Sequence, residues 1–568
     1  MKSKKLLSTV LALTMVSSTL LVGCGDKKTE EKKPEVDTTA KDNAKKDKVQ
    51  ELTFASAPGA QVNPGVTRTN TEWGPEGYIY EGLVRNAKNK DGVDAPKEGV
   101  AKSWEKSSDG LTYTFTLRDN AKWADGQAVT AEDFVYSWQR LVDPKSDCAK
   151  NGSLLNGIVK NAKEIQEGTK AKEELGVKAD GNKFIVTLEK PCLYFLEYCF
   201  HPNLKPVRKD YVEKYGKEMG KTVESIMGNG AYKCTFYQVK NKMVFEKSDT
   251  YWNKDTRDIQ KITFLDMREE NPKYSAFTEK QIDRVGLSDS DLVSNLKSME
   301  HVQNISKQGT DVTFFMFNCK NEFLANKNIR KAIANGFSRE GYIDTIANGL
   351  GQPAYNMVPP TISCGGNKYN PGDFKSEISK LDAKALLKEG LKELGKSEDP
   401  SQIQLRIVTR GTTQNEKDTV EYFIDEFKKN LGIVIKADLV DYTIMYDKVG
   451  KGDYEIAYGG WFADWNDPSN FLDTFITGGY YAAEAGYSNK DYDALIEKAH
   501  NETDAKKAAE FYAQAEKIIC IDDPAIASFE FGASNTFSWD FVKGYENRPN
   551  LGFEDFEGIY ISGKEDMK

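Results

Sequence analysis

The chain has 568 residues, of which 39% are hydrophobic and 29% charged, and its formal net charge at pH 7 is −9. This length is enough for about three or four domains, and the apolar content excludes a chain that is disordered throughout. The acidic balance argues against a general nucleic-acid-binding protein, which would carry a basic domain or stripe.

The N-terminus has the layout of a secretion signal. Three of the first five residues are lysine, and the uncharged segment 6–23 ends in Leu-Val-Gly before Cys24. A basic start, an apolar run and a small residue at the cleavage site are typical of a signal peptide. The string also resembles the bacterial lipobox, which implies that residues 1–23 are removed and that Cys24 carries a diacylglyceryl group and palmitate-like chains. The alternative is a single membrane-spanning helix at the start of the chain.

A charged segment follows the lipobox. Residues 24–50 are rich in Lys, Glu, Asp and Thr and contain no aromatic residue, so we expect a flexible linker that cannot fold by itself. The chain has eight cysteines and no Cys-x-x-Cys pair. We therefore expect the thiols other than Cys24 to be small buried groups rather than disulfides.

The first half of the globular part contains clear strand and helix signals. Residues 111–117 and 183–188 alternate apolar and polar side chains, which predicts two half-buried strands. Between them, Thr130 and Asp133 have the spacing of a capping box at the start of an amphipathic helix that runs to Leu141.

The second half predicts a strand–helix–strand unit. Residues 404–408 and 433–439 are strand-like, and 415–430 between them are helix-like, an arrangement that normally gives two parallel strands. Further amphipathic helices are expected at 381–394, 491–500 and 505–519. The fold class is therefore α/β with mixed sheets.

The sequence lacks the common signatures of catalysis. Its three histidines are far apart, and neither a His-Glu-x-x-His string nor a Gly-x-Ser-x-Gly elbow occurs. The segment 216–222 has three residues between its glycines, where a phosphate-binding loop has four. We predict a protein that is not an enzyme and that holds no metal or cofactor, although a Ser–His dyad built from distant positions stays open.

Several motifs resemble the oligopeptide-binding proteins of ABC importers. They occur in family order: YTFTLR at 113–118, WADG at 123–126, VTAEDFVYSW at 129–138, GNGAY at 228–232, NIRKA at 328–332 and GWFADWNDPSNFL at 460–472. The resemblance covers nearly the whole chain after the linker, and it identifies the chain as a member of that family.

The resemblance implies a two-lobed periplasmic-binding-protein-like fold with three subdomains and a hinge that closes on the ligand. The first lobe would comprise 51–80, 204–284 and 533–568, with an inserted subdomain at 81–203, and the second lobe would comprise 285–532. The implied partners are an oligopeptide and an ABC permease with its cytoplasmic ATPases. The implied protein is a monomer on the extracellular face of a Gram-positive cell membrane, held there through Cys24.

A bound peptide needs a carboxylate for its ammonium group, because a buried charge must be paired. By the register of the 460–472 motif, Asp464 is that residue; Asp467 competes, although it suits a helix cap better. Gly460 and Phe462 would bind the peptide main chain as in β-augmentation. Trp461 would form the wall of a side-chain pocket, although core packing is an equally good explanation for it.

Five further positions are compared with the family. Tyr442 aligns with a second pocket aromatic, and Arg68 aligns with a residue near the ligand entry. The positions that clamp the ligand carboxylate in well-known relatives align with Asn321, Glu416 and Tyr458, none of which is basic. We therefore expect C-terminally amidated peptides to bind nearly as well as free acids. The neighbouring Lys320 and Lys417 are the alternative clamp residues. Another cargo, such as a signalling peptide, a nickel chelate, haem or a sugar, and an extracellular peptidase remain alternatives.

Overall fold

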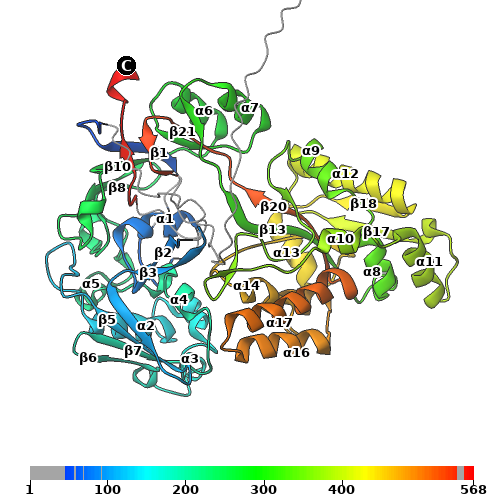
Figure 1. Ribbon diagram of the computed structural model, residues 1–568, viewed down its shortest axis with the longest axis horizontal. Coiled ribbons are helices and arrows are strands. Elements are labelled where there is room, and N and C mark those ends of the chain that lie inside the picture. Colours follow the sequence, from blue (N-terminus) through cyan, green and yellow to red (C-terminus); the bar gives the residue numbers. More distant parts are fainter. Residues whose placement is uncertain are drawn as a thin grey trace, which may run out of the picture. The chain divides into compact units, whose positions relative to one another are not determined.

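The structure is a computed structural model that describes residues 45–56, 59, 61–67, 70–90, 92–545 and 556–567. The predicted signal peptide, Cys24 and Arg68 lie outside these residues, as do residues 24–44 of the predicted linker. All described helices and strands belong to one compact unit, Lys46–Lys568. Its elements form two bodies, and each body is built on one large sheet (Figure 1).

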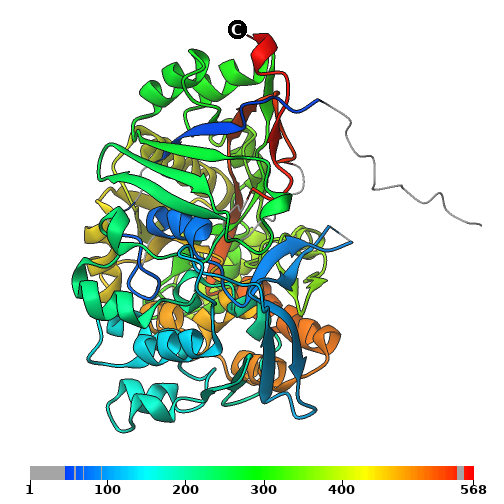
Figure 2. The ribbon, with the colours of Figure 1, turned by 90° about the vertical axis from the view of Figure 1, so that its left-hand side faces the viewer.

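The first body contains a seven-stranded mixed sheet in the order β12-β21-β11-β1-β10-β9-β8. Its central strand β1 is parallel to β10 and β11, whereas the other neighbours are antiparallel. The strands are β1 (Glu51–Ser56), β8 (Tyr232–Gln238), β9 (Lys242–Lys247), β10 (Lys261–Asp266), β11 (Arg284–Gly286), β12 (Val302–Asn304) and β21 (Thr536–Trp539). Figure 2 shows the blue β1 next to the green strands of this sheet.

A four-stranded antiparallel sheet and two small ribbons complete the strands of the first body. They are β4 (Ala101–Lys106), β5 (Thr112–Leu117), β7 (Lys183–Thr187) and β6 (Val177–Asp180), the pair β2 (Val84–Lys88) and β3 (Asp94–Glu98), and the pair β22 (Val542–Lys543) and β23 (Tyr560–Ile561). Both strands predicted for this half, β5 and β7, are confirmed.

The helices of the first body include the one predicted from its capping box. They are α1 (Asn70–Ile79), α2 (Ala131–Val142), α3 (Ala162–Gln166), α4 (Phe195–Tyr198), α5 (Lys209–Tyr215), α6 (Glu270–Thr278) and α7 (Ser290–Ser298). At the start of α2, the Thr130 side chain accepts from the Asp133 amide and the Asp133 carboxylate accepts from the Thr130 amide. This reciprocal pair satisfies two amides that the first turn leaves free.

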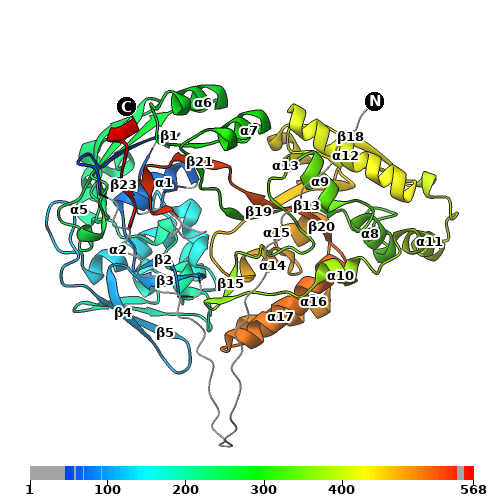
Figure 3. The same cartoon turned by 45° about the horizontal axis from the view of Figure 1, so that its top comes forward.

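The second body is built on a six-stranded sheet in the order β14-β20-β13-β19-β17-β18 (Figure 3). Its strands are β13 (Gln308–Phe317), β14 (Gln352–Pro353), β17 (Gln404–Val408), β18 (Val434–Asp438), β19 (Ile456–Phe462) and β20 (Ile526–Ala533), with a separate ribbon of β15 (Ser363–Cys364) and β16 (Asn367–Lys368). The predicted strand–helix–strand unit is confirmed, because β17 and β18 are parallel and α12 (Gln414–Leu431) connects them.

Helices cover both faces of this sheet. Besides α12, the helices of the second body are α8 (Lys327–Ala334), α9 (Arg339–Thr345), α10 (Phe374–Ile378), α11 (Ala383–Glu393), α13 (Tyr442–Gly450), α14 (Ser469–Leu472), α15 (Tyr480–Ala485), α16 (Lys490–Asn501) and α17 (Ala505–Lys517). Alternate residues of β13 serve separate cores: Phe314 packs in the core that includes α16 and α17, and Phe315 packs in the core that includes α8, α11 and α12. We call these the α16–α17 face and the α12 face.

The division into domains stays a prediction, but the first sheet extends past one predicted boundary. β12 pairs with β21 in that sheet, and Leu296 belongs to the core of the first body. The first body therefore includes Asn304, beyond the expected limit at residue 284.

The described cysteines are free, as expected. No helix in the described ranges is long and apolar enough to span a membrane.

Candidate functional site

Strand β19 has an open edge. On one side it pairs with β13 over its whole length, from Ile456 to Phe462. On the other side it pairs with β17 only through Ile456 and Ala457. No strand in the described part of the chain pairs with the second edge at 458–462.

The hydrogen bonds between β19 and β13 show which residues of β19 face that open edge. The Ala463 amide donates to the Thr310 carbonyl oxygen at 2.9 Å, so Ala463 faces β13. Because backbone groups alternate in direction along a strand, Trp461 also faces β13. The N–H and C=O groups of Gly460 and Phe462 therefore point away from β13, and the Gly460 carbonyl oxygen accepts from the Tyr481 hydroxyl at 2.8 Å. These are the two residues that the sequence predicted for main-chain binding.

The loop after β19 places Asp464 at the end of this edge. Asn470, buried at the start of α14, accepts hydrogen bonds from the Trp461 indole N–H at 2.8 Å and from the Asp464 amide at 3.2 Å. The Asp464 side chain is half-buried, and burial raises the pKa of its carboxyl, an effect that Asn470 partly offsets. Within the described residues, no cationic side chain lies within ion-pair distance of Asp464.

Asp467, the competing candidate, has a different environment. It is fully buried, and its carboxylate accepts from the amide of Ser469, the first residue of α14, at 2.9 Å. Burial raises the pKa of its carboxyl to about 7. Asp467 therefore stabilises the helix start, while Asp464 remains available at the strand edge.

Contacts with the first body hold the same loop in place. The Trp465 ring stacks on Tyr194, with ring centroids 5.6 Å apart. The Asn466 side chain donates to the Asp94 carbonyl oxygen at 3.0 Å and accepts from the Ser363 amide at 2.9 Å. The two residues that follow Asp464 thus anchor the loop that carries it.

An aromatic wall lies on the α16–α17 face beside the open edge. We use this name for Trp461, Tyr442, Tyr446 and Tyr480. The Tyr442 and Tyr446 ring centroids are 4.9 Å apart, and those of Trp461 and Tyr480 are 6.1 Å apart. Tyr442 is 55% exposed and Tyr480 is 42% exposed, so neither is a buried core residue.

Charged groups lie on the α12 face. The Arg410 guanidinium lies 4.4 Å from the centre of the Tyr458 ring, and its Nη1 lies 3.1 Å from where a Cβ on Gly460 would stand. Arg410 Nε is 3.5 Å from Glu416 Oε1. Two of the three aligned clamp positions therefore meet around an arginine from a different position. The third, Asn321, instead accepts from the amides of its own turn.

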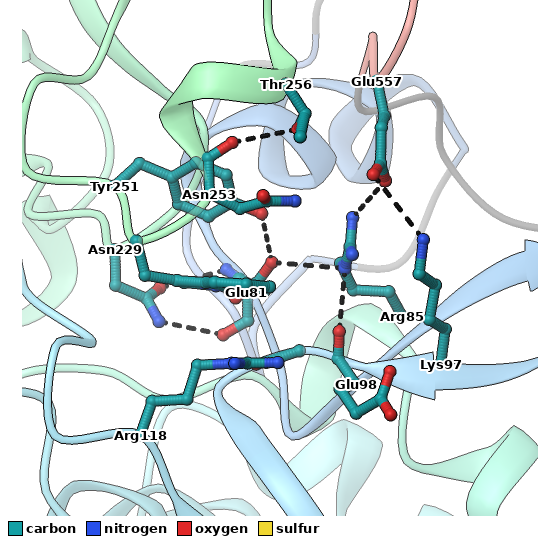
Figure 4. Close-up of polar contacts among 12 residues, drawn as sticks. Glu81, Arg85, Lys97, Glu98, Arg118, Asn229, Tyr251, Asn253, Thr256 and Glu557 are labelled. Carbon is teal, nitrogen blue, oxygen red and sulfur yellow. Dashed lines mark hydrogen bonds and ion pairs between the residues drawn. The ribbon is translucent and has the colours of Figure 1, made fainter.

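A second group of charged residues surrounds the buried Glu81 in the first body (Figure 4). Glu81 accepts from the Tyr251 hydroxyl at 2.5 Å and from the Trp252 indole N–H at 2.6 Å. The Arg118 guanidinium lies 3.6 Å from the centre of the Trp252 ring, and Arg85 donates to Glu557 at 2.7 Å. Because each of these charges has its partner within the chain, we interpret the group as a structural junction.

The structure therefore brings together Asp464, Gly460, Trp461, Phe462 and Tyr442 of the predicted site residues. Sequence reasoning missed Tyr446, Tyr480, Glu484 and Arg410. Tyr446 follows Tyr442 by four residues on one helix, which was a usable signal; the others come from distant segments. Among the described residues, no group of His, Cys, Asp and Glu is arranged to hold a metal ion.

The chain is similar to known bacterial solute-binding proteins. The profile of the bacterial extracellular solute-binding proteins, family 5 Middle, matches residues 95–483. The oligopeptide-binding protein OppA of Bacillus subtilis (strain 168) is 31% identical over 510 residues, which are 88% of this chain and 90% of that protein. The periplasmic oligopeptide-binding protein OppA of Salmonella typhimurium is 30% identical over 498 residues, which are 86% of this chain and 88% of that protein.

Solved structures show the same fold. Haemophilus influenzae OppA in complex with the peptide RPPGFSPFR has a TM-score of 0.71 and 27% identity, with coverage of 91% of this chain and 100% of that chain. Listeria monocytogenes OppA bound to peptide has a TM-score of 0.68 and 29% identity, with coverage of 91% and 99%. The predicted two-lobed α/β fold with mixed sheets is confirmed.

Proposed function

Because this chain belongs to family 5 of the bacterial extracellular solute-binding proteins, we propose that it binds oligopeptides in an extended conformation and delivers them to an ABC permease for import. Binding would shift an open–closed equilibrium of two lobes, and the permease would recognise the closed form. The chain would act as a receptor without catalysis, metal or cofactor.

One observation carries this proposal: the open edge of β19 ends at a carboxylate that has no cation partner among the described residues. An extended peptide can add to such an edge through its main chain, which gives affinity for many sequences. Phe462 supplies an outward N–H and C=O, and Gly460 supplies an outward N–H beside a carbonyl oxygen that already accepts from the Tyr481 hydroxyl. Asp464 supplies the negative charge that a peptide ammonium group needs once it is removed from water.

The remaining site residues complete the proposal. Trp461 and Tyr442 would contact ligand side chains, and roomy pockets that hold water would accept different ones. Arg68 would lie near the ligand entry. We also propose the predicted domain division, with its second lobe starting after Asn304, and a monomeric receptor.

We further propose that the receptor is held at the extracellular face of the membrane by diacylated Cys24. Two acyl chains give stable anchoring. Metabolic labelling with a palmitate analogue should mark the chain, and Cys24→Ser should abolish the label and release the protein into the medium. A labelled Cys24→Ser variant would refute the anchor.

The test of peptide binding uses the protein without its signal peptide. Native mass spectrometry should detect co-purified peptides, and calorimetry after their removal should show binding of defined tripeptides to pentapeptides. The same peptides should be intact after prolonged incubation, which separates a receptor from a peptidase. Absence of binding to every peptide, or cleavage of the panel, would contradict the proposal.

A further inference from the structure

The open edge of β19 separates two different environments. In an added strand, successive side chains point to opposite faces of the sheet. One set would meet the aromatic wall on the α16–α17 face, and the other set would meet Tyr458 and Arg410 on the α12 face. Every second side chain of a bound peptide would therefore face the aromatic wall.

An acidic residue stands beside that wall. Glu484 follows Tyr480 by four residues on α15, so the two side chains share one face of the helix. Glu484 is half-buried, and burial raises the pKa of its carboxyl. Burial also raises the pKa of Tyr480 to about 12, and the Glu484 charge adds to that increase. The carboxylate is therefore close enough to the wall for its field to act on the tyrosines.

The Glu484 carboxylate makes no hydrogen bond or ion pair with any described residue. This distinguishes it from the buried Glu81, which has several partners. Both features favour a cation. The half-buried carboxylate attracts it through its charge, and the three exposed tyrosine rings attract it through their electron-rich faces.

From this juxtaposition we infer that the aromatic wall and Glu484 select a basic side chain, lysine or arginine, of the bound peptide. The inference rests on the proposed function and adds the chemical class of the ligand. An apolar side chain of the peptide would cover the rings, but it would remove water from Glu484 without giving the carboxylate a partner. An acidic side chain would be repelled by the Glu484 carboxylate.

The test compares matched peptides in which only the charge changes. Lysine is replaced by norleucine, and arginine by citrulline, at each position of a tetrapeptide in turn. For the wild-type protein we expect the basic peptide to bind about tenfold more tightly at alternate positions only. In Glu484→Gln this advantage should fall below about threefold, while the norleucine and citrulline peptides keep their affinity.

Two further variants control for folding and for net charge. Glu497→Gln, at an exposed site on α16, removes the same charge from the same body and should leave the advantage unchanged. Tyr480→Leu should lower the advantage, and Tyr480→Phe should keep most of it, because the ring face is retained. Melting temperatures close to that of the wild type confirm that the variants are folded.

The outcomes separate this inference from the proposed function. Equal affinity for lysine and norleucine at every position, with both peptides bound tightly, would overturn the inference and leave peptide binding intact. An equal loss for charged and neutral peptides in Glu484→Gln would also overturn it, because the residue would then be structural. Failure of all peptides to bind the wild type would overturn the proposed function and the inference together.

Discussion

Replacing Asp464 by asparagine should weaken peptide binding by about 30- to 150-fold. The substitution keeps the size of the side chain and removes its charge, so the ligand ammonium group is left in the site without a counterion. Removing one partner of a buried charge pair costs about 2–5 kcal/mol. Asp464 is half-buried, so we take the lower part of that range, about 2–3 kcal/mol, and tenfold in affinity corresponds to about 1.4 kcal/mol.

A double-mutant cycle with an N-acetylated peptide identifies the partner of Asp464. Acetylation removes the ammonium charge, so it should cost the wild type a factor similar to that of Asp464→Asn. In the Asp464→Asn variant, acetylation should cost less than about threefold, because the interaction is already lost. Isothermal titration calorimetry measures all four dissociation constants.

Asp467→Asn is the matched control. It changes a carboxyl three residues away in the same loop, whose pKa burial raises to about 7, and asparagine can still accept from the Ser469 amide, so the affinity should stay within about threefold of that of the wild type. The reasoning is refuted if Asp464→Asn binds as tightly as the wild type, or if acetylation costs the same in both proteins.

Three other predictions follow from the geometry. Asn470→Ala should weaken binding about fivefold to tenfold in calorimetry, because it removes the acceptor that orients Trp461 and Asp464; unchanged binding would contradict that positioning role. C-terminal amidation of a peptide should change its affinity less than threefold, because Arg410 already faces Glu416, whereas a hundredfold loss would show a carboxylate clamp. Burial raises the pKa of Glu197 to about 8. Above about pH 4.5 the unfolded chain releases this proton, whereas the folded protein keeps it. The free energy of unfolding therefore decreases as pH rises from about 4.5 to 8. Glu197→Gln should therefore be more stable than the wild type at pH 9 and similar to it at pH 4, as measured by urea unfolding, and a parallel pH dependence in both proteins would exclude this role of Glu197.

Local patterns predicted much of the fold. The capping box at Thr130 and Asp133 is a contact between residues three apart, so the sequence contains all the information needed for it. The same holds for the strand–helix–strand unit of β17, α12 and β18, where the alternation of apolar residues and a glycine after the helix define each element.

The site was predictable only where it is continuous in sequence. Gly460 to Asp464 lie on one strand and the loop after it, so a single motif identifies them. Arg410 contacts Tyr458 of this strand from a different segment, and Glu484 lies beside Tyr480 on α15, so both positions depend on how distant elements pack. The open edge itself is a property of strand pairing, which depends on where β17 ends relative to β19.

The most direct test of the account is a crystal structure of the protein with a bound tripeptide. We predict that the peptide main chain hydrogen-bonds to Gly460 and Phe462 along the free side of β19, and that its amino group lies within about 3 Å of the Asp464 carboxylate. A complex in which the peptide lies elsewhere, or in which its amino group pairs with a different acid, would contradict the account.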